Sequence, residues 1–331
     1  MKKLFLLIVG FPLILFMVSC STTFLMISEG ESFDALSKIT DSKLPCVFPN
    51  GGDSSTNLVF CMKEPGDFYN IYLKDNVLTS ATIKKTDGQN FNLVPNYNKA
   101  TKRIVFQYWD KDNFDIYYID ALKGKAITQV TNTDENEYSP AWSPDGTKII
   151  FEKGAPPKLY VDLKKGTARS SKSVNQIILP NNQIWIKNLE TGELKMVGQG
   201  SYPKFSPDGN TIVFVKYDLS KSKTKETGTI WIMSADGENQ KQLTNANLGY
   251  AVLPNWKPDG KEVIFQLTKP KKTDSDIYTI DIDGEKLNQY TVNKSNDFSP
   301  YWSTDYYIYF SSDRGGKAGN YQIWRFKIPD L

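Results

Sequence analysis

One short phrase recurs along this chain and limits the folds that it can adopt. Three copies end in Pro-Asp-Gly, at 144–146, 207–209 and 258–260, and a weaker copy lies at 299–305. Each copy is followed by a short apolar run that ends in phenylalanine, at Phe151, Phe214, Phe265 and Phe310. A repeat of about fifty residues that is built only of strand-like pieces is typical of a β-propeller.

Each repeat divides into four strands. The inner strand ends at the Pro-Asp-Gly turn, because proline and glycine suit a tight reversal, and the apolar run forms the second strand. An Ile-aromatic pair such as Ile230-Trp231 lies on the third strand. An Asp-Gly turn such as Asp236-Gly237 then leads to an outer strand that ends in Leu-Thr, as at Leu243-Thr244.

Two degenerate copies of this pattern lie upstream and raise the number of blades to six. The prolines that we assign to the inner strands are Pro45, Pro95, Pro140, Pro203, Pro254 and Pro300. The sequence therefore predicts an all-β, six-bladed propeller with four-stranded blades. We expect an insertion near 154–182 to form a long loop between the second and third strands of one blade.

The two ends of the chain complement one another. The last repeat stops at its third strand, 322–328, and lacks an outer strand. A strand-like segment at 34–40, ahead of the first repeat, ends like the outer strands. We expect this segment to complete the last blade, which closes the ring and removes an open sheet edge. The propeller is then predicted to cover 34–331.

The N-terminus has the features of an export signal. A basic start is followed by an apolar stretch, 4–18, and by a small-residue site that ends in Cys20. This site resembles a bacterial lipobox, which implies a lipoprotein signal peptide at 1–19, lipidation of Cys20 and a tether at 20–33. The alternative is one uncleaved spanning helix over 4–27. In both cases we expect a membrane-anchored protein of the cell envelope, on the periplasmic or extracellular face.

Two further cysteines, Cys46 and Cys61, fall in the first repeat. We expect them on adjacent antiparallel strands in an oxidising compartment, where a disulfide can form. The alternative is that they are buried free thiols that act as small apolar residues.

Six of the seven tryptophans fall on repeat positions, and we interpret them as core residues between neighbouring blades. They are Trp142, Trp185, Trp231, Trp256, Trp302 and Trp324. Trp109 lies outside the pattern, in the loop that is predicted after the second strand of the second blade. It is a weak candidate for contact with a partner.

The recurring phrases, the Ile-aromatic pairs and Ser312-Asp313-Arg314-Gly315 resemble the TolB-type six-bladed propeller over about residues 34–328. The resemblance implies that Asp313 and Arg314 form a local pair that holds their loop. The periplasmic member of that family carries an α/β domain before its propeller and works in the Tol–Pal assembly. Only about a dozen residues separate Cys20 from the predicted closing strand, so we expect the scaffold to carry over and not that assembly.

The composition excludes several kinds of chemistry. The chain contains no histidine, which excludes Ser-His-Asp and Cys-His catalysis and the usual zinc sites. Its 40 basic and 37 acidic residues give no basic footprint for nucleic acid. Catalysis by two carboxylates stays open, although no pair stands out. We expect no catalytic residue and no cofactor. The Asp-rich segments 110–115 and 274–276 suit either calcium or plain turn chemistry.

Residues just before the inner-strand prolines are expected to rim one channel entrance. Their aromatic and acidic side chains suit a peptide or a glycan, and the alternative is that they only cap the strands. They are Asn92, Glu137, Tyr138, Ser201, Tyr202, Tyr250, Asp297 and Phe298. The sequence thus predicts a monomeric, non-enzymatic scaffold that binds an envelope protein. The alternative is binding or processing of cell-surface polysaccharide by channel carboxylates.

Overall fold

The structure is a computed structural model, and it describes residues 27–28, 36–52, 56–79, 81–110, 113–154, 182–218 and 227–328. The lipobox at Cys20 and almost all of the alternative spanning helix lie outside these residues. So does most of the predicted long loop near 154–182. In the part of the chain that is described, no helix has the length and apolar character needed to cross a membrane.

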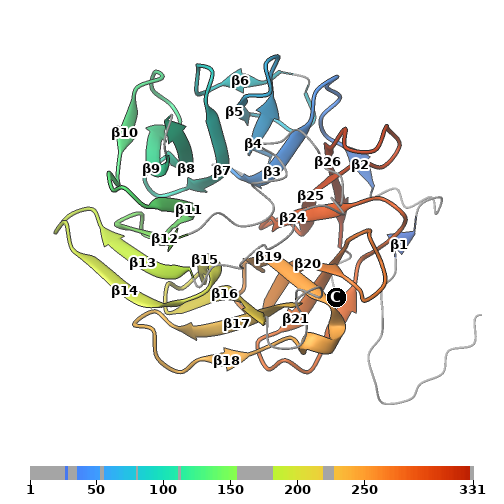
Figure 1. Cartoon of the computed structure of the whole chain (residues 1–331). Helices are drawn as coiled ribbons and strands as arrows, with labels where there is room; N and C mark the ends of the chain where they lie inside the picture. Colours follow the sequence, from blue (N-terminus) through green and yellow to red (C-terminus); the bar gives the residue numbers. More distant parts are fainter. Residues whose placement is uncertain are drawn as a thin grey trace, which may run out of the picture.

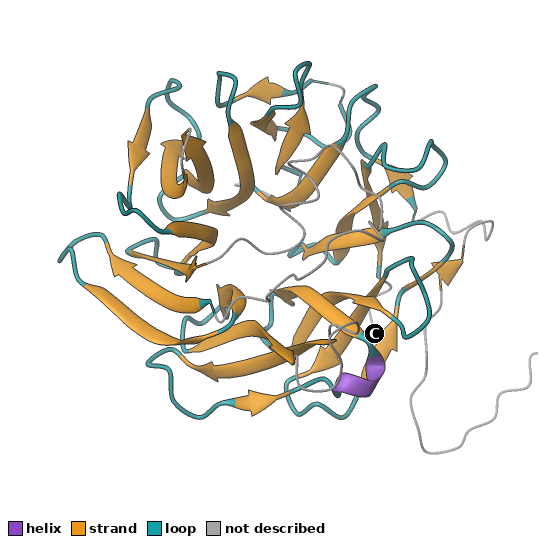
Figure 2. Cartoon of the chain, viewed as in Figure 1, coloured by secondary structure: helices purple, strands orange, loops and turns teal. Residues whose placement is uncertain are grey.

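The sheets are arranged around a central axis, and neighbouring strands within each repeat are antiparallel (Figure 1). Figure 2 shows that helix, within the described residues, is limited to the short η1 (Ala246–Leu248). Three four-stranded sheets follow chain order from the inner to the outer strand. Their strands are β11 (Asn136–Trp142), β12 (Lys148–Gly154), β13 (Gln183–Asn188), β14 (Leu194–Gln199); β15 (Ser201–Phe205), β16 (Thr211–Asp218), β17 (Thr227–Ser234), β18 (Lys241–Gln242); and β19 (Tyr250–Trp256), β20 (Glu262–Thr268), β21 (Asp276–Asp281), β22 (Leu287–Gln289).

A further four-stranded sheet joins the two ends of the described chain. It contains β24 (Asp297–Trp302), β25 (Tyr307–Ser312), β26 (Gln322–Lys327) and β2 (Ser37–Lys38). Ser37 lies opposite Arg325, and the Ile39 N–H donates to the Ile323 carbonyl at 2.7 Å. The predicted closure by the segment before the first repeat is confirmed. Upstream, β1 (Ile27–Ser28) pairs in parallel with β23 (Thr291–Val292).

The first two repeats form one eight-stranded sheet. Its strands are β3 (Cys46–Gly51), β4 (Leu58–Lys63), β5 (Tyr69–Lys74), β6 (Ile83–Lys84), β7 (Phe91–Asn98), β8 (Arg103–Asp110), β9 (Asn113–Asp120) and β10 (Ile127–Gln129). A single parallel pair, Tyr69 with Phe91, joins its two four-stranded halves. The fold is thus an all-β propeller of four-stranded units, and the number of six blades depends on dividing this sheet at that pair.

A β-bulge interrupts each of the described inner strands directly before a proline. The residue before the proline has a positive φ, between 50° and 56°, at Phe48, Val94, Ser139, Tyr202, Leu253 and Ser299. In the first blade this proline is Pro49, so the sequence-based assignment of Pro45 to the inner strand is wrong. Pro45 lies just ahead of β3, where its carbonyl accepts the Lys63 N–H at 2.9 Å.

The threonines at the Leu-Thr-like ends of the outer strands have a specific role. In five blades the threonine Oγ1 accepts the N–H of the isoleucine in the Ile-aromatic pair, at 2.8 or 2.9 Å. The pairs are Thr86 with Ile71, Thr131 with Ile116, Thr244 with Ile230, Thr291 with Ile277 and Thr40 with Ile323. Because Thr40 belongs to the closing segment, that segment makes the same hydrogen bond to the third strand as the outer strands of the other blades.

The core lies within and between the blades. The phenylalanine of each second strand is fully buried, and so is most of the apolar run around it. The inner-strand tryptophans Trp142, Trp256 and Trp302 are buried, as expected. The third-strand tryptophans Trp185, Trp231 and Trp324 are half-buried and pack against the core from the side.

The structure contradicts the disulfide interpretation. Cys46 lies opposite Met62 and Cys61 lies opposite Val47, so the two side chains point to opposite faces of the sheet. Both are buried free thiols. Burial raises the pKa of Cys46 to about 11 and also raises that of Cys61, which makes both thiols poor nucleophiles.

Candidate functional site at the propeller axis

The residues predicted to rim the channel do lie at the starts of the inner strands, but most of them are not on the surface. Tyr250 is half-buried, and the others are buried: Asn92, Glu137, Tyr138, Ser201, Tyr202, Asp297 and Phe298. Tyr138 packs on Phe114, with ring centroids 5.2 Å apart. Of these residues, Tyr202 borders the axial cavity that is described next. Their role in binding stays a prediction.

A cavity lies on the axis, where the six β-bulges meet. Its volume is about 30 Å³, and the residue before the proline of every bulge contributes to its wall. The residues that follow the bulge prolines add polar groups, namely Asn50, Lys204 and Asn255. The rest of the wall consists of prolines, apolar side chains and the two serines Ser139 and Ser299. A space of this size suits one small polar group, such as the tip of a larger ligand.

Hydrogen bonds between neighbouring blades support the bulges. The Ser139 N–H donates to Gln107 Oε1 at 3.0 Å, the Tyr202 N–H to Glu152 Oε1 at 3.2 Å, and the Phe48 N–H to Ser311 Oγ at 3.1 Å. Gln107, Glu152 and Ser311 each follow the core phenylalanine of a second strand. The same repeat position therefore holds the strained backbone of the next blade, which keeps the cavity wall rigid.

Glu152 is the acidic group of this set, and it is completely buried. Burial raises its pKa, while hydrogen bonds from Ser139, Asn182 and Ser201 act in the opposite direction. The Asn182 Nδ2 group donates to Glu152 Oε2 at 2.7 Å. With its oxygens used by neighbours, Glu152 stabilises the junction between two blades.

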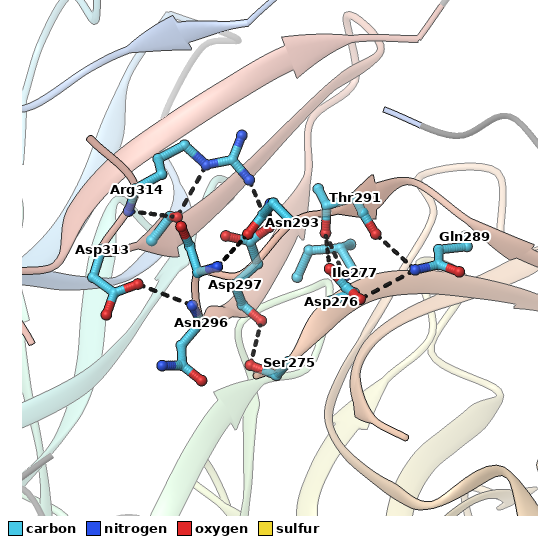
Figure 3. Close-up of polar contacts among 12 residues, drawn as sticks. Ser275, Asp276, Ile277, Gln289, Thr291, Asn293, Asn296, Asp297, Asp313 and Arg314 are labelled. Carbon is cyan, nitrogen blue, oxygen red and sulfur yellow. Dashed lines mark hydrogen bonds and ion pairs between the residues drawn. The ribbon is translucent and has the colours of Figure 1, made fainter. Parts of the chain in front are cut away.

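A second polar group lies near the start of β24 (Figure 3). Arg314 donates to Asp297 Oδ2 at 2.6 Å, and both side chains are almost fully buried. Asn293 donates to the same oxygen at 2.9 Å. Asp276 accepts a hydrogen bond from Gln289 at 3.1 Å and a longer one from Thr291 at 3.4 Å. Burial and the charge of Asp297 raise the pKa of Asp276 to about 7.

The same positions in the second and third blades hold Asp115 and Glu137. Thr131 donates to Asp115 at 3.3 Å, and Thr133 donates to Glu137 Oε1 at 2.5 Å. Burial and the neighbouring Asp115 carboxyl raise the pKa of Glu137 to about 7, while the Thr133 hydrogen bond acts in the opposite direction. Glu137 therefore holds its proton to a higher pH than an exposed glutamate does.

The predicted pairing of Asp313 with Arg314 is wrong, because each residue has another partner. Arg314 pairs with Asp297, while Asp313 accepts the backbone N–H groups of Asn296 at 2.9 Å and Gly319 at 3.2 Å. Both residues still hold the loop after β25, but they do so through different neighbours. The arginine is drawn inward because the buried Asp297 carboxylate requires a compensating charge.

The Asp-rich segments have other partners in the structure. Among the described residues no group of three or more acidic, cysteine or histidine side chains could hold a metal ion. The carboxyls of Asp115 and Asp276 instead accept side-chain hydrogen bonds from outer-strand residues. Residues 111 and 112 of the first segment lie outside the described chain.

We call the face on which the inner strands begin the entrance face, and the face with the Pro-Asp-Gly turns the turn face. Several half-buried aromatic residues lie on the entrance face. Tyr217 stacks on Tyr250 with ring centroids 5.9 Å apart, and Trp109 packs against Phe91 at 5.2 Å. Trp109 is the next-to-last residue of β8 and half-buried, so its expected place in an exposed loop is wrong.

Sequence reasoning missed two residues of the axial site, Lys204 and Glu152. Lys204 stands in the second copy of the recurring phrase, directly after the inner-strand proline. Burial lowers the pKa of its ammonium group to about 8. The available signal was the comparison of repeats at this position, where the other blades have uncharged residues. Glu152 could have been found in the same way, as the only acid that follows a second-strand phenylalanine.

Similarity in sequence to curated proteins and similarity in fold to solved structures both support the propeller architecture. No protein-family model matches the chain. The Tol-Pal system protein TolB of Francisella tularensis subsp. holarctica is 25% identical over 72% of this chain and 52% of its own length. Dipeptidyl-peptidase 5 of Porphyromonas gingivalis is 25% identical over 63% of this chain and 31% of its own length. The chain thus spans at most about half of these curated relatives.

Solved structures share the architecture at lower identity. TolB from Acinetobacter baumannii superposes with a TM-score of 0.62 and 17% identity, over 84% of this chain and 65% of that one. Oligogalacturonate lyase from Vibrio parahaemolyticus superposes with a TM-score of 0.56 and 15% identity, over 94% and 98%. Fold and sequence together define a β-propeller. More particularly, the chain resembles TolB in sequence and in fold.

Proposed function

We propose that this chain is a membrane-anchored envelope lipoprotein whose propeller binds a protein partner at the entrance face and catalyses no reaction. The similarity to TolB, a protein of the Tol-Pal system, is the observation that carries the proposal. The anchor is the lipid that the lipobox at Cys20 implies. The propeller acts as a monomer, since closure of the ring by β2 uses the open sheet edge within one chain.

The side chains of the entrance face support a protein partner. Half-buried aromatic residues supply large apolar area at little cost in conformational entropy, and they are enriched at the centres of protein interfaces. Trp109, Tyr217 and Tyr250 have this character, since each packs on the core and keeps part of its ring accessible. The rigid sheets below hold them in place.

The test is site-specific crosslinking in intact cells. A photoreactive phenylalanine analogue is placed at Trp109 or Tyr250, and at Tyr306 as the matched control. Tyr306 is an aromatic residue with 48% of its surface exposed, and it lies on the turn face between β24 and β25. We expect one protein adduct of defined mass from positions 109 and 250 and none from 306. Adducts only from position 306 would contradict the proposed face.

A second candidate is processing of an acidic polysaccharide by carboxylates. It is favoured by Glu137 and Asp276, because a pKa of about 7 suits a general acid or base at neutral pH. The oligogalacturonate lyase shows that a similar fold occurs in an enzyme of this kind. Incubation with oligogalacturonate, followed by ultraviolet detection of unsaturated products, separates the two candidates. We expect no product, and product formation would replace the first proposal.

A further inference from the structure

The wall of the axial cavity has an uneven charge. Lys204 is its charged side chain, and no acidic residue is among the described residues that line it. The remaining lining residues are prolines, apolar side chains and neutral polar groups such as Asn50, Asn255 and Ser299. The cavity therefore presents positive charge and hydrogen-bond donors to whatever occupies it.

Lys204 is fixed at this place by the fold. It follows the bulge at Tyr202-Pro203, and its carbonyl accepts the indole N–H of Trp256 from the next blade at 3.2 Å. Within the described chain its ammonium group forms neither an ion pair nor a hydrogen bond, and burial lowers its pKa. Lys257 shows the usual arrangement, since its Nζ lies 2.7 Å from Glu262 and 3.5 Å from Asp259.

An ammonium group that is partly removed from water and has no counter-charge is unfavourable, and proteins usually pair such groups. The cavity offers room beside Lys204, and solvent still reaches its side chain, which is half-buried by accessible surface. Asn50 accepts hydrogen bonds at Oδ1 from Asn96 at 3.3 Å and from the Tyr97 N–H at 3.2 Å. Its Nδ2 group is thus left to donate toward a ligand.

We propose that the axial cavity binds a carboxylate, with Lys204 as its ionic partner and Asn50 as a neutral donor. The charge favours this anion, because one ammonium group matches a monoanion, whereas a phosphate dianion is usually held by several cations or by arginine. The inference rests on the proposed function, in that the carboxylate belongs to a peptide segment of the protein partner. The cavity then recognises an acidic side chain or a chain end of that partner.

The experiment follows the lysine signals of the whole propeller by NMR, with ¹³C-labelled lysine. N-acetylglycine is the probe, N-acetylglycinamide is its neutral match, and inorganic phosphate is the alternative anion. We expect Lys204 to titrate near pH 8 without ligand, as its pKa of about 8 implies. N-acetylglycine shifts this signal saturably and raises the apparent pKa of Lys204, because a nearby anion favours the charged form. The neutral amide leaves the signal unchanged.

Variants make the assignment specific. Lys204→Met removes the charge with little change in volume, and we expect it to weaken N-acetylglycine binding at least tenfold. Lys204→Gln serves the same purpose if the Met variant does not fold. Lys257→Met, a lysine that already has carboxylate partners, leaves probe binding unchanged. Equal responses to the acid and the amide, a stronger response to phosphate, or unchanged binding by Lys204→Met would each overturn the proposal.

This experiment and the crosslinking experiment fail independently. Loss of adducts at positions 109 and 250 together with a normal Lys204 response would contradict the proposed partner face and leave a carboxylate site in the cavity. Normal adducts at positions 109 and 250, together with a Lys204 signal that does not respond to N-acetylglycine, would support the partner face. They would show that the cavity takes no part in recognising the partner.

Discussion

Two pairs of carboxyl groups occupy equivalent repeat positions and differ in how their charge is balanced. Asp276 and Asp297 lie at the fifth and sixth repeats, and Asp115 and Glu137 lie at the second and third. In each pair an outer-strand glutamine and threonine donate to the first acid. The Asp297 carboxylate has Arg314 as its counter-charge, whereas burial and Asp115 shift Glu137 toward its protonated form.

The difference shows which properties the repeat controls. Strand positions and backbone geometry recur, so the polar side chains arrive at the same places in both interfaces. The cation comes from a loop near the end of the chain, outside the repeated pattern. The interface of Asp276 and Asp297 is therefore expected to depend on an ion pair as well as on a proton, and the interface of Asp115 and Glu137 on a proton.

The largest expected effect is the removal of the cation. Arg314→Met leaves the Asp297 carboxylate buried without its partner, and breaking such a pair costs about 3–5 kcal/mol of unfolding free energy. Urea unfolding at pH 7 measures this loss. Arg314→Lys keeps the charge and serves as the control, with a clearly smaller loss. A loss below about 1 kcal/mol for the Met variant would show that Arg314 does not balance Asp297.

The second effect concerns the proton on Glu137. Its pKa rises from 4.5 to about 7 on folding, so the folded protein holds this proton to a higher pH than the unfolded chain. The free energy of unfolding must then decrease as pH increases from 4.5 to 7, and the contribution is constant above that range. Glu137→Gln removes it, and we expect the variant to gain roughly 1–3 kcal/mol relative to wild type between pH 4.5 and pH 8.

Urea unfolding at several pH values gives this difference. Asp276→Asn is the matched variant at the other interface, where the pKa of Asp276 is also raised to about 7, so its curve is expected to flatten in the same direction. If the unfolding free energies of wild type and Glu137→Gln change in parallel with pH across the whole range, protonation of Glu137 does not stabilise this interface.

The smallest expected effect tests whether the two interfaces share one backbone framework. Thr131→Val and Thr291→Val each remove the hydroxyl that accepts an isoleucine N–H, and we expect each to cost about 1 kcal/mol. Thr244→Val removes the same contact in a blade without a carboxyl pair and isolates the backbone part. Thermal unfolding compares the three variants. Losses that differ more than about threefold would break the equivalence of the two positions.

Much of the fold could be predicted because each repeat carries local signals that agree with one another. The turns, the phenylalanine of each second strand and the Leu-Thr ends all mark strand boundaries that the structure contains. The prediction failed in the first repeat, where Pro45 and Pro49 compete for the inner strand. Only the bulge, which requires a positive φ before the proline, distinguishes them, and a single sequence does not display that angle.

The candidate site was less predictable, because burial and charge pairing depend on residues that are distant in the chain. The residues before the inner-strand prolines were placed at the right end of the strands, but the sequence does not reveal that most of them are buried. The partner of Arg314 lies 17 residues away on another strand, not beside it. Comparison of the repeats marks Lys204 as the charged residue at its position, but its place in the wall of a cavity follows from the ring of inner strands that surrounds it.

The pairing of β2 with β26 has a consequence for folding during synthesis of the chain. Thr40 and Gln322, which are hydrogen-bonded across it, are 282 residues apart, so the ribosome must finish nearly the whole chain before this bond can form. Until then the nascent protein exposes an unpaired strand at each end, and contacts of such long separation form slowly. A chain truncated at its last strand is therefore expected to stay open and to associate with other copies.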